Sequence, residues 1–348
     1  MVLTVNSILV IGARNSGKTA FLDFLQRTLA LPPHKHPSPL PDHEGHHHDH
    51  SDEDGYCSRY VESEFDGERV GLTLWDSDGL DGNLVDLQTR GIVGFLESKF
   101  EDTLMEEVRV VRSPQVRDTH IHCTFLLLDP VNLDRNIAVA RKQGRSKVSD
   151  PRLVGILDEE MDVQVLRAIQ GKTTVVPVIS KADIVTTPHM AYLKMAVRDS
   201  LKKAKVDPLE TLTLREKGED EEEYDPEEWN DYDGRNGYAS SHQEGGGGEG
   251  FSIPFSILSP DPETLESVGD EVGRRYPWGF ADPFDDEHCD FVSLKETVFG
   301  EWRNELQAAS REICYERWRT DRLDANNLSS DSRIITDATN GLHLSPGV

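Results

Sequence analysis

The sequence predicts an α/β protein with a mostly parallel sheet. Five apolar, β-rich runs recur along the chain, and helical or irregular segments separate most of them, which is the order expected of strands joined by helices. The first run leads through a glycine-rich turn into a segment with helical apolar spacing. The runs are VNSILVI at 5–11, VGLTLWD at 70–76, IHCTFLLLD at 121–129, TVVPVIS at 174–180 and IPFSILS at 253–259.

The turn after the first run has the P-loop pattern Gly12-x-x-x-x-Gly17-Lys18-Thr19. Its glycines let backbone N–H groups turn toward phosphate oxygens, Lys18 can reach the β- and γ-phosphates, and the Thr19 hydroxyl can ligate Mg²⁺. Because strand, turn and helix occur in order, we predict phosphate binding rather than a ligand-free turn.

A second motif, Asp76-Ser77-Asp78-Gly79, ends the run at 70–76. An Asp-x-x-Gly there places an acid that holds Mg²⁺ through water and a glycine N–H that meets the γ-phosphate. Mg²⁺ is therefore expected at Thr19 and Asp76. The predicted phosphate-binding residues are Gly12, Asn15, Ser16, Gly17, Lys18, Thr19, Ala20 and Gly79.

A third motif, Lys181-Ala182-Asp183, follows the run at 174–180. In a P-loop protein such an Asp accepts two hydrogen bonds from the guanine edge, and the Lys stem lies along the base. For an isolated Lys-Ala-Asp, a solvated ion pair of Lys181 and Asp183 is the better interpretation. Here strand, spacing and P-loop agree, so guanine recognition is predicted, with GTP or GDP as the ligand.

Composition narrows the class of protein. The chain has 348 residues, 36% of them hydrophobic, and a net charge of −27. Nucleic acid is not an expected partner, because phosphate contacts need clustered positive charge. Four cysteines without CxxC spacing predict reduced thiols. No signal peptide or membrane-spanning run is apparent, so a cytoplasmic location is expected.

Four polar or low-complexity segments interrupt the pattern, and we expect them to be flexible. They are the His-, Pro- and acid-rich 31–56, the polar 141–152 within an insertion at 131–160, the acidic to glycine-rich 216–250, and the tail 324–348. From 290 to 323, apolar residues recur three and four apart without proline, which predicts one long helix.

Beyond these motifs, the chain resembles the septin family over about residues 5–323. The similar stretches, in family order, are FLESKFEDTLMEE at 95–107, DTHIHC at 118–123, MDVQVL at 161–166, IPFS at 253–256, GRRYPWG at 273–279, EHCDF at 287–291 and YERWRTDRL at 315–323. The resemblance implies a septin-type GTP-binding domain at 5–323, with a septin-specific region and terminal helix at 251–323. It also implies that Arg274 lies over the guanine and that Ser259 takes a base-contacting place, beside Pro260, which has no N–H.

Septins polymerise through an interface across the nucleotide and another built from terminal helices, and their filaments are scaffolds at membranes and division sites. The resemblance therefore implies septin-type partners and a cytoskeletal location, at septa or the division site. Three departures qualify this: the residues before Ile8 include no Lys or Arg, no C-terminal coiled coil is present, and 129–160 looks inserted near the nucleotide-side interface. At about 1 kcal/mol per basic residue, the first departure predicts weak membrane binding by the chain alone.

Hydrolysis is expected to be very slow or absent. Switch GTPases orient the attacking water with a Gln just after Asp-x-x-Gly, whereas Gly79 is followed by Leu-Asp-Gly. Septins that hydrolyse GTP rely on a Thr in the loop after the first helix, but no Thr occurs between Thr28 and Thr73. The alternative is an active GTPase switch that works as a monomer on effectors.

Two features invite a functional interpretation that we do not favour. Seven of the thirteen histidines fall between His34 and His50 and could bind Zn²⁺ or Ni²⁺, but no fixed ligand geometry is visible and a solvated loop is preferred. Trp278 in YPWG is interpreted as a buried packing anchor rather than a ligand-stacking residue, and by the resemblance it belongs near the nucleotide-side interface.

Overall fold

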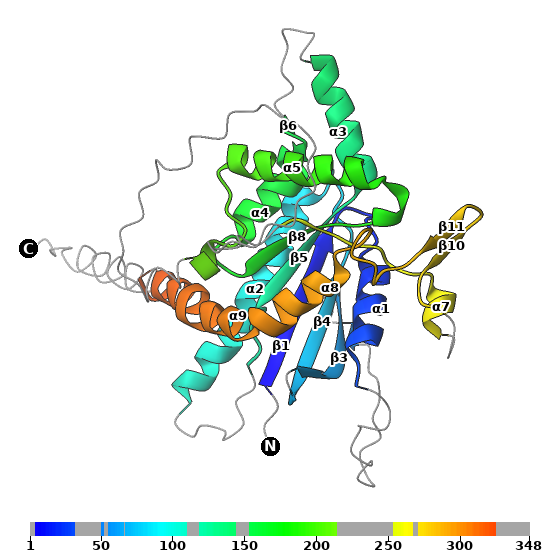
Figure 1. Cartoon of the computed structure of the whole chain (residues 1–348). Coiled ribbons are helices and arrows are strands. Elements are labelled where there is room, and N and C mark those ends of the chain that lie inside the picture. The colour runs from blue at the N-terminus through cyan, green and yellow to red at the C-terminus, as the bar shows by residue number, and fades with distance from the viewer. Residues whose placement is uncertain are drawn as a thin grey trace, which may run out of the picture.

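A computed structural model describes residues 4–31, 50–51, 55–65, 67–109, 118–143, 153–213, 253–266 and 271–324. Its centre is a seven-stranded sheet in the order β2-β3-β4-β1-β5-β8-β9 (Figure 1). The strands are β1 (Thr4–Gly12), β2 (His50–Ser51), β3 (Tyr56–Phe65), β4 (Glu68–Ser77), β5 (Cys123–Leu128), β8 (Thr174–Ile179) and β9 (Phe255–Ser256). The β4, β1, β5, β8 and β9 strands are mutually parallel, which confirms the predicted α/β fold.

One long strand of this sheet was missed in the sequence. β3 pairs antiparallel with β4 over its whole length, from Tyr56 opposite Ser77 to Phe65 opposite Glu68. Apolar and polar residues do not alternate along β3, where Ser63 is buried and Tyr60 is exposed, so the period-two pattern is weak. The expected loop at 31–56 is therefore wrong at its ends, since Leu31 and Tyr56 are buried and His50–Ser51 forms β2. Residues 32–49 and 52–54 lie outside the described residues.

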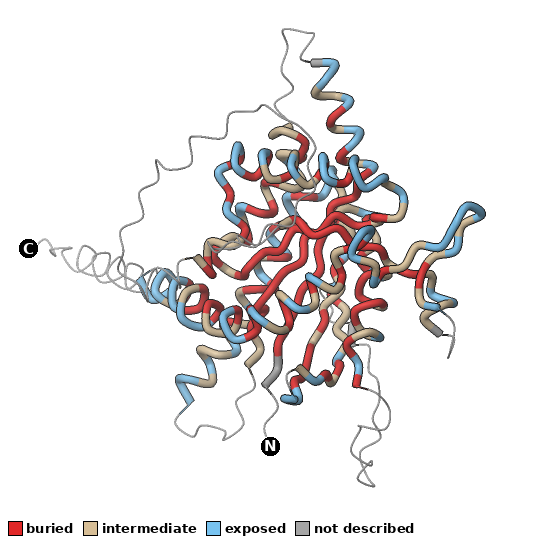
Figure 2. The backbone as a smooth tube through the Cα atoms, in the orientation of Figure 1, coloured by how far each residue is buried: buried red, intermediate tan, exposed pale blue. Residues whose placement is uncertain are grey.

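Helices flank the sheet, and its central strands form the buried interior (Figure 2). Side chains such as Leu9 of β1, Phe125 of β5 and Val176 of β8 are fully buried, and Phe21 and Phe24 of α1 pack against the same core. The helices are α1 (Lys18–Leu29), α2 (Val85–Val108), α3 (Pro130–Gln143), α4 (Gln164–Ile169), α5 (Thr187–Ala204), α7 (Pro262–Glu266), α8 (Phe291–Leu294) and α9 (Arg303–Ala309). Short hairpins are formed by β6 (Leu153–Val154) with β7 (Leu157–Asp158) and by β10 (Arg274–Tyr276) with β11 (Gly279–Ala281).

The insertion and the C-terminal region depart in detail from expectation. Within the insertion, α3 extends to Gln143, so the first residues of the polar segment 141–152 are helical. The predicted helix at 290–323 is helical over 291–324, but a turn at Trp302 interrupts it and two π-helical segments, Lys295–Glu301 and Ser310–Tyr315, lie within it. Segments 144–152 and 214–252 and the tail from 325 fall outside the described residues.

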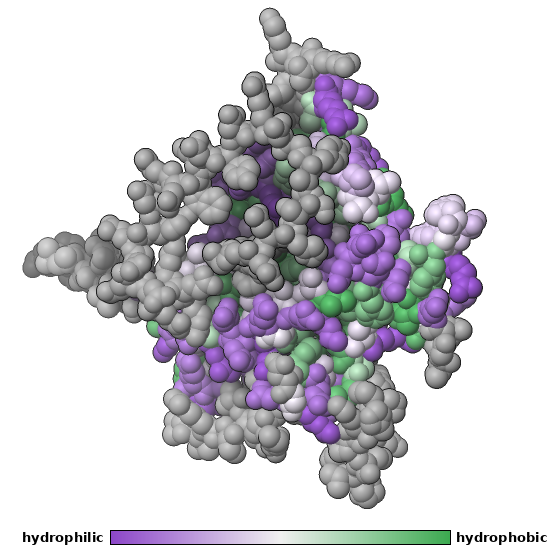
Figure 3. Space-filling model, in the orientation of Figure 1, coloured by the Kyte–Doolittle hydropathy of each residue, from purple (hydrophilic) through white to green (hydrophobic). Residues whose placement is uncertain are grey.

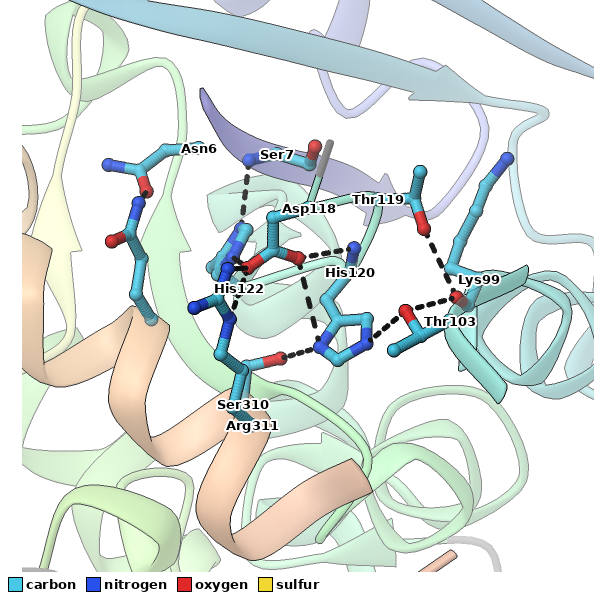
Figure 4. Close-up of polar contacts among 11 residues, drawn as sticks. Asn6, Ser7, Lys99, Thr103, Asp118, Thr119, His120, His122, Ser310 and Arg311 are labelled. Atoms are coloured by element: carbon cyan, nitrogen blue, oxygen red, sulfur yellow. Dashed lines mark hydrogen bonds and ion pairs between the residues drawn. The ribbon is translucent and has the colours of Figure 1, made fainter. Parts of the chain in front are cut away.

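A buried polar cluster holds the C-terminal helical region against the end of the sheet where β5 begins (Figure 4). Arg311 donates from Nε to the Asp118 carboxylate at 2.7 Å, and its Nη2 lies at the same distance from that carboxylate. His122 Nδ1 accepts from the Ser7 N–H at 3.0 Å, so the ring proton is on Nε2, which lies 3.3 Å from Asp118. Asp118 thus links β1, the start of β5 and the terminal helix.

His120 completes this cluster. Its ring lies between the Thr103 hydroxyl of α2, at 2.8 Å, and the Ser310 hydroxyl, at 3.3 Å, and it contacts Phe100 edge to face. Burial lowers the pKa of His120 to about 4, so the ring is neutral near pH 7. Because both ring nitrogens have partners, the neutral imidazole carries no cost of an unsatisfied buried polar group.

The visible surface is mixed in polarity, and the cysteines are thiols. Where it is not grey, the face seen in Figure 3 carries many hydrophilic side chains among smaller apolar areas. Among the described helices none is both long and apolar enough to cross a membrane. None of the four cysteines, all of which the structure describes, forms a disulfide, and burial raises the pKa of the Cys289 thiol to about 11.

Candidate nucleotide site

The P-loop is a compact turn between β1 and α1. Asn15 and Gly17 adopt left-handed backbone conformations, with φ of 64° and 90°, and the Ser16 N–H donates to the Ala13 carbonyl at 3.1 Å. A Cβ at Gly12 would lie 2.5 Å from the Leu127 carbonyl oxygen, so only glycine fits there. The loop ends at the N-terminus of α1, where backbone N–H groups and the helix dipole favour an anion.

Lys18 lies inside this turn. Its Nζ donates to the carbonyls of Gly12 at 3.2 Å and Ala13 at 3.1 Å, and the residue is 7% exposed. Burial lowers the pKa of Lys18, and the carboxylates of Asp76 and Asp78 partly offset the effect. The P-loop therefore holds a buried cation whose protein partners are neutral carbonyls, which an anionic ligand can replace.

The predicted Mg²⁺ residues come together. The Thr19 hydroxyl donates to Asp76 Oδ2 at 2.8 Å, and Asp76 Oδ1 is buried without a hydrogen-bond partner among the described residues. Hydroxyl and carboxylate oxygens are the ligands that Mg²⁺ prefers, with water completing the shell. The two side chains fit the ion, and elsewhere in the described part of the chain no cluster of three His, Cys, Asp or Glu residues could hold a metal.

The Asp-x-x-Gly segment is hydrogen-bonded to the P-loop. The Leu80 N–H donates to the Gly12 carbonyl at 3.0 Å, and the Arg14 N–H donates to the Leu80 carbonyl at 3.1 Å. A Cβ at Gly79 would lie 2.7 Å from the Arg14 Cα, so this close approach requires glycine. Gly79 is thus beside the predicted phosphate residues, and Ala20 lies in the first turn of α1.

At the predicted guanine end, Asp183 and Arg274 lie in contact, and Lys181 lies two positions before Asp183 in the same turn. The Asp183 side chain is 1% exposed, and its Oδ2 is 3.2 Å from Arg274 Nη1 and accepts from the Tyr276 hydroxyl. Although burial alone would lower the pKa of Arg274, the Asp183 carboxylate raises it. Asp183 Oδ1 is buried and has no hydrogen-bond partner among the described residues.

Lys181 forms its ion pair with Asp129, not with Asp183, the partner considered in the sequence analysis. Its Nζ donates to Asp129 Oδ2 at 2.7 Å, so the ion pair of Lys181 with Asp183 does not form. The Lys181 backbone is left-handed, with φ of 53°, and the Ala182 N–H donates to the Ile257 carbonyl at 3.1 Å. That bond ties the Lys-Ala-Asp turn to the loop after β9, where Ser259 is half-buried and Pro260 buried.

Two residues of this end were not singled out in the sequence. Tyr276 lies within GRRYPWG and reaches Asp183 because β10 places it two positions after Arg274 on the same strand face. Asp129 directly follows β5, the neighbour of β8 in the sheet, and polar residues at adjacent parallel strand ends commonly meet. The sheet order, which the sequence does not give, was the missing signal.

The expectation that Trp278 is buried is wrong. This residue was interpreted as a buried packing anchor, but it is 83% exposed at the tip of the β10–β11 hairpin. Its ring stacks on Tyr276, with centroids 5.1 Å apart and 8° between the planes. A two-stranded hairpin that projects from the body, as Figure 1 shows, has no second layer at its tip to cover an indole.

A cavity lies beside the P-loop, and residues of the predicted insertion form part of its wall. With Ala13, Leu127 and the α3 residue Asn136, Asp162 lines a cavity of about 180 Å³. Burial raises the pKa of Asp162 to about 7, and its Oδ2 accepts from the Asp158 N–H at 3.1 Å. Asn136 and Asp158, which fall within the predicted insertion at 131–160, therefore line this cavity together with the P-loop residue Ala13.

The fold and the three strand-end motifs define an α/β protein of the P-loop GTPase type. The septin family model matches residues 4–139 and 153–332, so this chain belongs to the septin family. The unmatched residues 140–152 lie within the predicted insertion. The septin GTPase domain from Chlamydomonas reinhardtii has a similar structure, with a TM-score of 0.53 over 91% of this chain and 98% of that one; at 18% identity the likeness concerns the fold.

Similar sequences include proteins of two yeasts. The chain is 26% identical to septin homolog spn6 of Schizosaccharomyces pombe over 263 residues, which cover 75% of this chain and 56% of that protein. It is 25% identical to cell division control protein 11 of Saccharomyces cerevisiae over 276 residues, 78% of this chain and 56% of that protein. The chain thus matches little more than half the length of these relatives.

Proposed function

We propose that this chain binds guanine nucleotide, GTP or GDP with Mg²⁺, and serves as a septin-type scaffold subunit. The observation that carries the proposal is Asp183. Its carboxylate is almost fully buried, one oxygen is held by Arg274 and Tyr276, and the other has no described partner. A buried carboxylate oxygen without a donor is costly, and the paired N–H donors of a guanine edge would satisfy it.

The phosphate end supports the same ligand. Ser16 Oγ and Asp76 Oδ1 are both buried without a described partner, and Lys18 and Thr19 lie beside them. Phosphate oxygens would give Lys18 a charged acceptor, and Mg²⁺ would neutralise part of the triphosphate. The P-loop, Asp-x-x-Gly and Lys-Ala-Asp segments thus offer donors and acceptors for phosphate, metal and base in one site.

For assembly we propose partners that are themselves septin-type subunits, contacted through the nucleotide-bearing face. The supporting observations are family membership and the exposed aromatic hairpin next to Asp183, where Trp278 is 83% and Phe280 36% exposed. Exposed aromatic side chains are enriched at protein interfaces. Relatives of this chain include a protein named for cell division control, which suggests a cytoskeletal role at a division site.

For the reaction we propose little or no hydrolysis. Leu80 stands where a switch GTPase carries its water-orienting Gln, and its backbone is bound on both sides to the P-loop. GTP would then act mainly as a structural ligand. With a net charge of −27, the chain alone should bind anionic lipid only weakly.

The second candidate is a monomeric GTPase switch. It is favoured by the contact of Lys18 with the P-loop carbonyl of Gly12 and by the hydrogen bond of Thr19 to Asp76. The oligomeric state under native conditions distinguishes the two functions. Light scattering at low salt, with nucleotide content measured on the same sample, should show an oligomer containing guanine nucleotide. A strict monomer with bound nucleotide would support the switch, and a sample without nucleotide that also fails to take up added GTP and Mg²⁺ would contradict both.

A further inference from the structure

Arg14 is an exposed cation at the centre of the P-loop. Among the residues that the structure describes, its guanidinium has no ion pair, whereas Arg59, Arg274 and Arg311 each lie against a carboxylate. The guanidinium can therefore either stay in solvent or contact a phosphate bound in the turn.

The backbone contacts of Arg14 fix where its side chain leaves the loop. Its N–H donates to the Leu80 carbonyl at 3.1 Å, so this group is not available to a phosphate. A Cβ built at Gly79 would lie 3.0 Å from the Arg14 Cβ and 2.7 Å from its Cα. The side chain therefore starts directly beside Gly79.

Gly79 marks one end of the ligand. In an Asp-x-x-Gly segment it is the glycine N–H that meets the third phosphate, while the α- and β-phosphates lie further along the P-loop turn. The Arg14 side chain thus begins at the γ-phosphate end, and its length allows the guanidinium to bend over that group. A guanidinium offers a planar fork of donors that matches two phosphate oxygens.

Charge balance at this end also calls for a cation. The negative charges of Asp76 and Asp78 both raise the pKa of Lys18, and the Asp76 carboxylate accepts from Thr19 next to that lysine. A γ-phosphate adds further negative charge, which Mg²⁺ and Lys18 share with the β-phosphate. Arg14 is the additional positive group that a triphosphate would need and a diphosphate would not.

We propose that Arg14 binds the γ-phosphate and makes this site select guanosine triphosphate over diphosphate. The inference rests on the proposed nucleotide binding and goes beyond it by assigning the residue that distinguishes the two ligands. Charge-assisted hydrogen bonds of this kind correspond to about a tenfold to hundredfold change in affinity.

The test measures dissociation constants for GTPγS and GDP, each with Mg²⁺, on the full chain, for wild type, Arg14→Ala, Arg14→Lys and Arg90→Ala. Arg90 is an exposed arginine of α2 outside the P-loop, Asp-x-x-Gly and Lys-Ala-Asp motifs, and is the matched control. Arg14→Ala should weaken GTPγS binding tenfold or more and change GDP binding less than about twofold. Arg14→Lys should recover part of the loss, because it keeps the charge without the fork.

If Arg14→Ala leaves the ratio of the GTPγS and GDP dissociation constants unchanged, the assignment is wrong. This holds whether the two affinities both stay the same or both decrease. The same holds if Arg90→Ala shifts the ratio as much as Arg14→Ala. If wild type binds GDP and GTPγS but the ratio does not respond to Arg14, only this inference fails. If wild type binds neither, the proposed nucleotide function fails with it.

Discussion

The Asp183 carboxylate lies 3.2 Å from the Arg274 guanidinium, 91 positions further along the chain. This contact joins the end of β8 to the β10–β11 hairpin and occupies only one carboxylate oxygen. Arg274 therefore holds one oxygen of the Asp183 carboxylate and leaves the other without a hydrogen-bond partner among the described residues. This is the state that a guanine base requires of its acceptor.

Asp183→Asn should weaken GTP binding and favour xanthosine triphosphate. An amide cannot accept both guanine donors, and a site built on buried hydrogen bonds discriminates against the wrong analogue by on the order of 10⁴. Competition binding with GTP, XTP and ATP measures the change, and Asp199→Asn on the exposed face of α5 is the control. Equal affinity of wild type for ATP and GTP would contradict the guanine assignment.

Lys18→Ala should abolish nucleotide retention and lower the stability of the nucleotide-free protein. The carbonyls of Gly12 and Ala13 lose the Lys18 donor but keep the N–H groups of Leu80 and Ser16, so the cost is about 1 kcal/mol. Nucleotide content after purification and urea unfolding check the two effects, with the exposed Lys142→Ala as the control. Nucleotide at wild-type levels in Lys18→Ala would show that the P-loop is not the binding site.

Single-turnover hydrolysis of preloaded GTP with excess Mg²⁺ should be about 10² to 10⁴ slower than in a GTPase that carries the positioning Gln. The reason is that Leu80 offers no side chain that could orient water. The assay is run alone and with a septin partner. Fast turnover by the chain alone, lost in Lys18→Ala, would reveal a missed catalytic group and favour the monomeric switch.

The cluster around Asp118 should make stability depend on pH through His120. Burial lowers the folded pKa of His120 to about 4 from an ordinary value of 6.5, although Asp118 and Glu107 act in the opposite sense and His122 and Arg311 reinforce the shift. Between these values the unfolded chain binds the extra proton, so stability falls as pH drops from about 6.5 to about 4, by up to about 3 kcal/mol.

Asp162 has the reverse effect in the same range, because its folded pKa is raised to about 7 and protonation then favours the folded state. The contribution of His120 is therefore read from the difference between wild type and His120→Gln in urea unfolding at pH 7.5, 6, 5 and 4.5. The wild type should lose more stability than the variant as pH falls. Parallel curves would show that His120 does not titrate as inferred.

Trp278→Ala should leave the melting temperature almost unchanged, since the indole is 83% exposed and packs mainly on Tyr276. Surface substitutions of this kind change stability by about 0.5 kcal/mol or less. If the nucleotide-bearing face is the interface, the same variant should weaken self-association or partner binding by tenfold or more. Sedimentation across a concentration series measures this, and unchanged association would remove Trp278 from the proposed interface.

The sequence by itself determined the parallel α/β fold and the residues of the P-loop, Asp-x-x-Gly and Lys-Ala-Asp segments. Those features are local, because a glycine at positive φ or an apolar strand followed by a turn is encoded within a few neighbouring positions. The tertiary structure decided what depends on distant segments meeting. It paired Lys181 with Asp129, brought Tyr276 to Asp183, exposed Trp278 and added β3, whose register comes from β4. Strand order and hairpin position set these contacts, and no short window of sequence specifies either.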